Sequence, residues 1–266
     1  MSPTTLATPA ATSQESLSIE VIRRLLDNEV VGRHMYLFGE VASTNAVLRR
    51  VAEAGAREGT VVLAEEQRQG RGRLGQAWFS PPGVNLYASV LFRPDLPPEA
   101  VPAFSLIASL ALTDAIWVEG LPAVIREPND VLVDGRKVAG TLVECATTAG
   151  RTDYVILGVG VNVNVTRDAL REALGTAAGG ATSLRAEGGR EIDRNAFAAA
   201  FLGFLEKWFE AYTARGPAAV TAAWRRILVE APGGHDPARD GASLARARVG
   251  ADKRRWGTST PLTPRA

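Results

Sequence analysis

The hydrophobic residues of the chain follow a helical period in some segments and a strand period in others. The first helical period begins at Ser16, where Leu17, Val21, Leu25 and Leu26 fall on one face. Further helices are expected at 44–54, 99–118, 193–213 and 217–229. Strand patterns occur at 35–38, 60–64, 84–92, 131–133, 137–145 and 153–163. The sequence therefore predicts strands and helices that are mixed along the chain.

The connections between the later strands indicate the kind of sheet. Asp134 and Gly135 separate two apolar runs, and an Asp-Gly pair suits the two positive-φ positions of a type I′ hairpin turn. Hairpins join antiparallel neighbours, and no internal repeat is visible. We therefore expect an α+β domain with a mixed, largely antiparallel sheet flanked by helices.

The two ends of the chain lack such a pattern. Residues 1–15 are rich in Thr, Ala, Pro and Ser, and residues 230–266 contain few large aliphatic residues. Such segments cannot bury enough apolar surface to offset the lost conformational entropy. We expect one domain over 16–229, with disordered tails on either side. The Arg, Ala, Gly and Pro bias of 230–266 also resembles out-of-frame translation, so an aberrant, frameshifted terminus is the alternative.

Composition narrows the class of protein. Of the 266 residues, 46% are hydrophobic and 22% are charged, which is the balance of a globular protein. No run approaches the roughly 18 consecutive apolar residues of a membrane span. The N-terminus lacks the charged and apolar regions of a signal peptide. The sequence thus predicts a soluble, cytoplasmic protein without membrane contact.

Cysteine, histidine and charge exclude several kinds of site. One cysteine and two histidines are too few for a disulfide framework, a zinc knuckle or a haem-type site, and Cys145 is expected to be a packed small residue. The net charge of +1 conceals a basic end, because residues 225–266 hold nine Lys and Arg against four Asp and Glu. The body before it is mildly acidic, which does not favour nucleic-acid binding.

The loop after the second predicted strand carries Gly70, Gly72 and Gly75 in a G-x-G-x-x-G pattern. A dinucleotide site needs a helix directly after those glycines, but a Pro-Pro pair follows, and no Gly-Lys-Ser/Thr completes a phosphate loop. The same loop holds three arginines, Arg68, Arg71 and Arg73. Guanidinium groups on a glycine-rich backbone suit a carboxylate or phosphate ligand. A solvated basic loop is the alternative.

The predicted hairpin carries a second set of candidate residues. Asn129 and Asp130 stand at its start, where an amide and a carboxylate could hold a metal–phosphate. Lys137 lies on the return strand. It is either an edge-strand residue that prevents strand addition or a desolvated cation that faces a ligand.

The last predicted strand of the sheet contains Gly158, Gly160 and Asn162. Glycine weakens a strand and often marks the close approach of a ligand or of another backbone. These residues therefore favour a pocket wall over plain core.

Taken together, these segments resemble the biotin protein ligases in order and spacing, over roughly 34–228. The resemblance rests on Ser43-Thr44-Asn45, Gln67 with the loop 70–75 and Trp78, Pro128-Asn129-Asp130, Arg136-Lys137-Val138-Ala139-Gly140, and 158–162. It implies the class II synthetase-like catalytic domain of biotin and lipoate ligases, in a monofunctional form without a DNA-binding domain. The small C-terminal β domain of the family is missing or altered after about residue 229.

The resemblance implies a two-step reaction. Biotin and ATP give biotinyl-5′-AMP, and biotin then passes to a lysine of a biotin carboxyl carrier protein. Lys137 and Arg73 would be catalytic. The residues implied for biotin are Ser43, Thr44, Asn45, Gln67, Gly70, Arg71, Gly72, Arg73, Lys137 and Gly140. Those implied for ATP are Arg71, Arg73, Trp78, Asn129, Asp130 and Asn162, with Mg²⁺ on Asp130.

Two departures from the family pattern bear on activity. Arg126-Glu127 stand where the family usually has Lys-Trp, and Gln76 stands where a further Arg is common. One alternative is therefore a catalytically impaired relative that only binds biotin. A lipoate–protein ligase, which runs the same adenylation chemistry on a different acid, is the other alternative. No winged helix precedes the matched region, so DNA is not an expected partner. Relatives pair through a sheet edge, which leaves a homodimer open.

Overall fold

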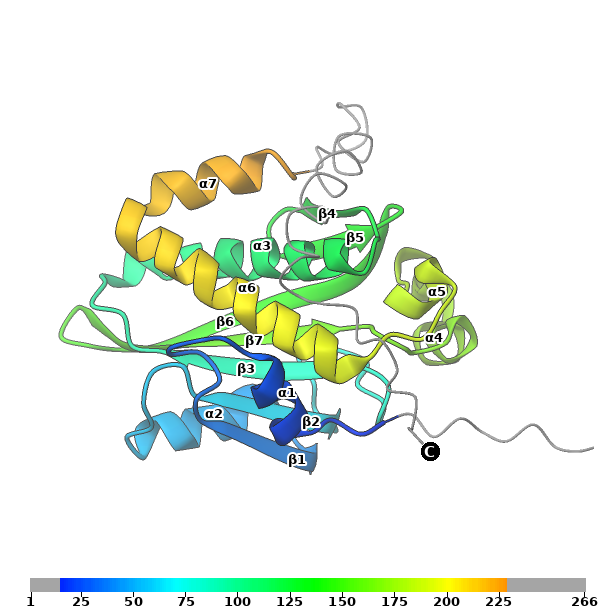
Figure 1. Ribbon diagram of the computed structural model, residues 1–266, viewed down its shortest axis with the longest axis horizontal. Coiled ribbons are helices and arrows are strands. Elements are labelled where there is room, and N and C mark those ends of the chain that lie inside the picture. The colour runs from blue at the N-terminus through cyan, green and yellow to red at the C-terminus, as the bar shows by residue number, and fades with distance from the viewer. Residues whose placement is uncertain (1–14, 229–266) are drawn as a thin grey trace, which may run out of the picture.

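One seven-stranded sheet organises the computed structural model of the protein, which describes residues 15–228 (Figure 1). The strands are β1 (Met35–Val41), β2 (Val61–Gln67), β3 (Leu86–Phe92), β4 (Ala123–Arg126), β5 (Asp130–Val133), β6 (Arg136–Thr148) and β7 (Arg151–Val161). Their spatial order is β1-β2-β3-β7-β6-β5-β4. Only β1 and β2 run parallel, which confirms the mixed, largely antiparallel sheet. The two expected tails lie outside the described residues, apart from residue 15.

Helices cover both faces of this sheet. They are α1 (Ile19–Leu25), α2 (Thr44–Glu53), α3 (Ala103–Val118), α4 (Arg167–Leu174), α5 (Leu184–Gly188), α6 (Arg194–Arg215) and α7 (Pro217–Arg225), with short 3₁₀ turns at Arg73–Gly75, Pro98–Ala100 and Gly175–Gly180. The larger core lies between the sheet and α1, α3, α6 and α7. Within the described part of the chain, α2 is the helix that covers the opposite face, along β2, β3 and part of β7.

Helix α3 is the centre of the larger core. It lies between the sheet and α6 (Figure 1), and twelve of its sixteen residues are buried. Among the described residues, the stretch Pro98–Val118 is long and apolar enough to cross a membrane, yet 72% of its most apolar window is buried inside the fold. Packing on two sides accounts for this apolar composition.

The smaller core leaves part of the second face uncovered. Leu48 and Ala52 of α2 pack there against Val62, Leu91 and Ile156. Side chains alternate along a strand, so the glycines at 158 and 160 share this face with Ile156. The sheet surface beyond α2 is therefore low and open, which creates room for a ligand.

The structure tests three local predictions: the hairpin turn, the first helix and the surroundings of Cys145. The turn at Asp134 and Gly135 has φ values of 50° and 70°, as the predicted type I′ turn requires. The first helix was placed wrongly: Ser18 caps it and it begins at Ile19, so Ile22 becomes the buried position and Leu25 is 37% exposed. Cys145 is also exposed rather than packed, because it lies near the projecting end of the β6–β7 hairpin.

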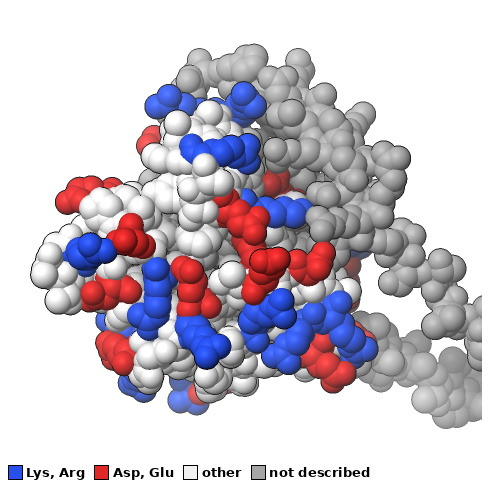
Figure 2. Space-filling view, turned by 60° about the vertical axis from the view of Figure 1, so that its left-hand side comes forward, with Lys and Arg blue, Asp and Glu red and all other residues white. Residues whose placement is uncertain are grey.

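The charged side chains on the surface are mixed in sign. Figure 2 shows Lys and Arg interspersed with Asp and Glu over the described part of one face, in agreement with the small net charge of +1. Many of these side chains form ion pairs, such as Arg68 with Glu40 at 2.7 Å and Arg49 with Glu144 at 2.9 Å. That face offers no continuous basic footprint of the kind that nucleic acid requires.

Candidate active site

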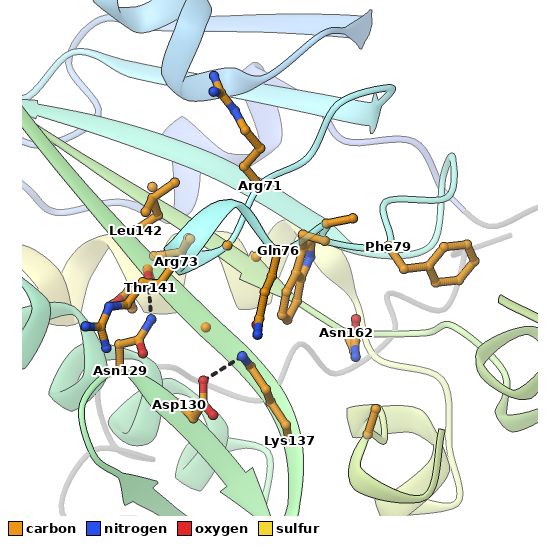
Figure 3. A pocket seen from close by; sticks show the side chains of 18 of the residues that line it. Arg71, Arg73, Gln76, Phe79, Asn129, Asp130, Lys137, Thr141, Leu142 and Asn162 are labelled. Atoms are coloured by element: carbon orange, nitrogen blue, oxygen red, sulfur yellow. Dashed lines mark hydrogen bonds and ion pairs between the residues drawn. The ribbon is translucent and has the colours of Figure 1, made fainter. Parts of the chain in front are cut away.

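A cavity of about 430 Å³ opens on the uncovered part of the sheet, between the start of α2, the glycine-arginine loop and the region of α4 (Figure 3). The sequence-predicted residues that line it are Ser43, Thr44, Asn45, Gln67, Arg71, Gly72, Arg73, Trp78, Asn129, Asp130, Lys137, Gly140 and Asn162. Of the residues implied for biotin and ATP, Gly70 alone is outside the lining. Segments that are far apart in sequence thus meet at one pocket.

The floor of the cavity is made by glycines on adjacent strands. Gly140 of β6 lies directly opposite Gly160 of β7 in the antiparallel register. A Cβ on Gly160 would lie 2.4 Å from the indole nitrogen of Trp78, and one on Gly158 would lie 2.3 Å from Oδ1 of Asn45. Only glycine allows these two side chains to lie so close to the sheet. This confirms the predicted pocket wall.

A chain of hydrogen bonds fixes the polar end of the pocket. Gln67 Oε1 accepts from the backbone N–H of Thr44 at 2.9 Å and from its hydroxyl at 3.2 Å. Gln67 Nε2 donates to Ser80 Oγ at 3.3 Å, and Ser80 donates in turn to the carbonyl of Trp78 at 3.0 Å. The orientation of the Gln67 amide is therefore set by protein partners on both sides.

Asn45 is held just as firmly. Its Nδ2 donates to Oε2 of Glu144 at 2.8 Å, and its Oδ1 accepts from Ser89 Oγ at 2.6 Å. Arg49 pairs with the same Glu144 carboxylate, at 2.9 Å. A buried amide with both ends satisfied is pre-organised, so Asn45 offers the pocket a fixed polar edge.

The glycine-arginine loop has a tight base and an open tip. At the base, the N–H of Trp78 donates to the carbonyl of Gly70 at 2.9 Å. A Cβ on Gly70 would lie 2.5 Å from Ser80 Oγ, so Gly70 acts by packing rather than by lining the cavity. The tip is exposed, and Leu74 at its end is 95% exposed with a φ of 55°. The tip is therefore the part that a ligand could reorder.

The loop arginines differ in their surroundings. Arg68 pairs with Glu40 outside the pocket at 2.7 Å. Arg71 and Arg73 line the cavity, although Figure 3 shows the Arg71 side chain extending away from Lys137. Only Arg71 and Arg73 are therefore placed to meet an anionic ligand, and a solvated role describes Arg68.

A hydrogen bond from a tyrosine to a backbone carbonyl holds the segment after the loop. The Tyr87 hydroxyl donates to the carbonyl of Pro81 at 2.9 Å. Burial raises the pKa of Tyr87 well above its usual range. The phenol therefore stays protonated and remains a hydrogen-bond donor under all ordinary conditions. It anchors the chain where the loop rejoins β3.

Lys137 carries the cation at the other end of the cavity. Its Nζ lies 2.5 Å from Oδ1 of Asp130 and 5.2 Å from the ring centre of Trp78. Figure 3 shows Lys137 and Asp130 pointing toward each other from neighbouring strands. The side chain is 28% exposed and lines the pocket. Lys137 pairs with Leu132 of β5 and bridges to Ala181, so the edge-strand alternative is wrong. That Lys137 faces a ligand stays a prediction.

Two asparagines brace the walls. Asn129 Nδ2 donates to the carbonyl of Thr141 at 2.5 Å, which ties the start of β5 to β6. Asn162 Nδ2 donates to the carbonyl of Thr182 at 3.0 Å and ties the end of β7 to the chain before α5. The amide nitrogens of both residues are therefore engaged in holding the pocket walls together.

An apolar wall of the cavity was missed at the sequence level. Leu170 and Leu174 of α4 and Ala177 of the following turn line it. The missed signal was local: Thr166 caps α4 through its side chain, and two leucines follow at an i, i+4 spacing before Gly175. Ser80, Ser89 and Glu144 were missed as well, because only the fold reveals their contacts with pocket residues.

Comparisons with known proteins agree with this geometry. Residues 38–162 match the Biotin/lipoate A/B protein ligase family. The chain is 34% identical over 209 residues to the bifunctional ligase/repressor BirA of Bacillus spizizenii, covering 78% of this chain and 63% of that protein. It is 33% identical over 247 residues to the biotin–[acetyl-CoA-carboxylase] ligase of Mycobacterium tuberculosis, covering 85% of this chain and 87% of that one.

A solved structure extends the likeness to three dimensions. The biotin protein ligase from Aquifex aeolicus in complex with biotin and ATP superposes with a TM-score of 0.62 at 25% identity, covering 74% of this chain and 79% of that one. The fold and the site thus define a ligase catalytic domain of the biotin/lipoate class. Within that class, the chain belongs to the biotin protein ligase family.

Proposed function

We propose that this protein is an ATP-dependent biotin ligase. It would form biotinyl-5′-AMP from biotin and ATP and then transfer biotin to a lysine of a biotin carboxyl carrier protein. The observation that carries the proposal is one cavity with a polar end at Thr44 and Gln67 and a cationic end at Lys137. The named activities of the relatives and the biotin- and ATP-bound neighbour support it.

Biotin has a polar ureido ring at one end, an apolar chain and a carboxylate at the other end. The fixed amide of Gln67 and the hydroxyls of Ser43 and Thr44 suit the ureido ring, because a few placed polar groups in a mostly apolar pocket give orientation. The glycine floor leaves room for the fused bicyclic ring and its chain. The carboxylate would then reach Lys137.

The first step joins two anions. The biotin carboxylate attacks the α-phosphorus of ATP, an acyl–phosphate bond forms, and pyrophosphate leaves. Cations must offset the repulsion and the charge that develops at phosphorus. Lys137 and Arg73 line the cavity where this would occur, and Arg71 becomes available when the exposed loop tip closes. Closure also excludes water, which protects the mixed anhydride from hydrolysis.

Magnesium enters with the nucleotide. The described residues contain no cluster of three or more His, Cys, Asp or Glu that could hold a metal ion. Both oxygens of Asp130, the predicted ligand, already face cations. The side chains therefore do not fit a protein-built Mg²⁺ site, and we propose that Mg²⁺ is bound by the triphosphate of ATP.

The second step needs an acceptor amine. A carrier-protein lysine attacks the acyl carbon of biotinyl-5′-AMP, an amide forms, AMP leaves and the amine loses a proton. The ATP requirement favours a cytoplasmic location. Residues 142–148 of β6 extend beyond its pairing with β5, so we propose that a homodimer would pair along this edge.

Biotin-dependent release of pyrophosphate from Mg-ATP tests the proposal without an acceptor. We expect release with biotin, little with lipoate, and a loss of about a hundredfold or more in Lys137→Ala. Lys207→Ala, an exposed lysine on α6, serves as the matched control and should keep full activity. Biotin binding without pyrophosphate release in the wild type would instead identify a binding-only relative, and release with lipoate would identify a lipoate ligase.

A further inference from the structure

Asp130 lies between two cations at the cationic end of the cavity. Its Oδ1 is 2.5 Å from Nζ of Lys137, and its Oδ2 is 2.8 Å from a guanidinium nitrogen of Arg126. The carboxylate is only 16% exposed, whereas Arg126 is 49% exposed. Most of the carboxylate surface is therefore committed to its two partners.

The sheet register produces this arrangement. Arg126 of β4 lies directly opposite Asp130 of β5, and Asp130 lies directly opposite Gly140 of β6. Lys137 is three residues before Gly140, and its Cε lies 3.2 Å from the position of a Cβ on that glycine. The lysine side chain therefore lies across Gly140 to reach the carboxylate of Asp130. A larger residue at position 140 would block that path.

The ammonium of Lys137 is restrained from two sides. Asp130 contacts it directly, and the ring of Trp78 lies 5.2 Å away in cation–π distance. A lysine side chain has several rotatable bonds, and fixing it costs conformational entropy. An ion pair and an aromatic face that restrain the ammonium before ligand arrives remove part of that cost.

We propose that Asp130 is a positioning residue for Lys137 rather than a ligand of magnesium. In the free protein it holds the ammonium at the mouth of the carboxylate site, and the carboxylate of the acid substrate then takes over as its counter-ion. This inference rests on the proposed function. It follows from the fact that both oxygens of Asp130 face cations, because a divalent ion at either oxygen would meet the like charge of Lys137 or Arg126.

The test compares Asp130→Asn with Asp134→Asn. Both substitutions remove one carboxylate charge from the same hairpin, and Asp134 pairs with Arg136 at 3.0 Å outside the cavity. Asp134 has a φ of 50°, which asparagine also tolerates. Two readouts are needed: the ligand-free signals of the lysine side chains, and the dependence of biotin-driven pyrophosphate release on Mg²⁺ concentration.

The lysine signals are simple to interpret. Lys137, Lys207 and Lys253 are the only lysines of the chain, so ¹³Cε-labelled protein gives three resonances, which Lys207→Arg and Lys253→Arg assign. We expect Asp130→Asn to shift the Lys137 resonance and Asp134→Asn to leave it in place. An unshifted Lys137 resonance in Asp130→Asn overturns the inference, even if the protein proves not to be a ligase.

The kinetic readout separates positioning from metal binding. We expect Asp130→Asn to lower kcat about tenfold to a hundredfold, with a half-activating Mg²⁺ concentration within about twofold of wild type. A metal ligand predicts the opposite, a rise of about tenfold or more in that concentration. A rise of that size, or an unchanged kcat, overturns the inference. Absence of pyrophosphate release in the wild type would refute the proposed function and leave the resonance measurement to decide the role of Asp130.

Discussion

At the scale of single residues, the glycines of the pocket floor determine what the cavity can hold. Gly158 and Gly160 lie on the same face of β7, and each is covered by a side chain that a Cβ would displace. Asn45 is a polar edge of the pocket and Trp78 restrains Lys137. Because glycines stand at 158 and 160, Asn45 and Trp78 can both lie directly on the sheet, at opposite ends of the site.

Gly160→Ala tests this role. The added methyl group would lie 2.4 Å from the indole nitrogen of Trp78, so the ring must shift. Overpacking of this kind costs about 1–3 kcal/mol, and we expect the Kd for biotin to rise about tenfold. Titration calorimetry measures it directly.

The control for this substitution is Gly39→Ala. Gly39 lies in β1 with nothing within 4 Å of the position of a Cβ. We expect its biotin affinity to equal that of the wild type. Equal losses in the two variants would show that strand glycines matter only for stability and would refute the pocket-floor role.

The glycines and Lys137 could be predicted from the sequence because their residue types are unusual for a strand. It could not reach Ser80 or Glu144, whose importance lies in hydrogen bonds to Gln67 and Asn45. Serine and glutamate are ordinary surface residues in a sequence. Only the packing of β6 against α2 and the closing of the loop base bring them to the site.

At the scale of elements, one buried carboxylate on α6 binds the backbone of the segment that precedes β1. Glu206 accepts hydrogen bonds from the backbone N–H groups of Glu29 at 2.6 Å, Val30 at 3.0 Å and Val31 at 2.5 Å. The carboxylate is buried, and the chain it binds leads directly into β1. This contact fixes the position of the first strand relative to the helical layer.

Glu206→Gln should therefore destabilise the protein. The amide keeps one acceptor oxygen and places a donor against backbone donors, which costs about 1–3 kcal/mol in free energy of unfolding. Urea denaturation measures this loss. Glu210→Gln, one turn later on the exposed side of α6, is the matched control and should change stability by less than about 0.5 kcal/mol. Similar losses in both would refute the assigned role.

Most long elements could be predicted because their hydrophobic period is sustained. The strand β4 was missed because four residues between turns carry too little pattern, and it is recognised only by its pairing with β5. The short helices α4 and α5 were missed for the same reason. The parallel pairing of β1 and β2 was implied by a strand, a helix and a strand in succession, yet hairpin signals elsewhere dominated the expectation.

At the scale of the whole molecule, the small number of lysines limits how far the reactive product can modify the protein itself. Only three of the 30 basic side chains are lysines. A mixed anhydride such as biotinyl-5′-AMP acylates lysine amines, whereas arginine stays protonated and unreactive. The chain therefore presents few groups that its own proposed product could modify.

Self-biotinylation of an Arg68→Lys variant tests this reasoning. Arg68 is 71% exposed at the base of the glycine-arginine loop, outside the pocket lining. In acceptor-free reactions with biotin and Mg-ATP, we expect mass spectrometry to find biotin on the new amine, in an amide bond formed with release of AMP. Arg24→Lys, 69% exposed on α1, should be labelled several-fold less. Wild-type protein labelled as heavily as Arg68→Lys would contradict the prediction.

In the proposed reaction, one cavity joins the carboxylate of biotin to the α-phosphate of ATP, and an isotope measurement distinguishes this reaction from others. Biotin with ¹⁸O in both carboxylate oxygens is incubated with Mg-ATP and the protein, and hydroxylamine traps the activated acyl group. We expect biotin hydroxamate together with AMP that carries one ¹⁸O from biotin. Unlabelled AMP, or ADP and phosphate as the nucleotide products, would contradict it.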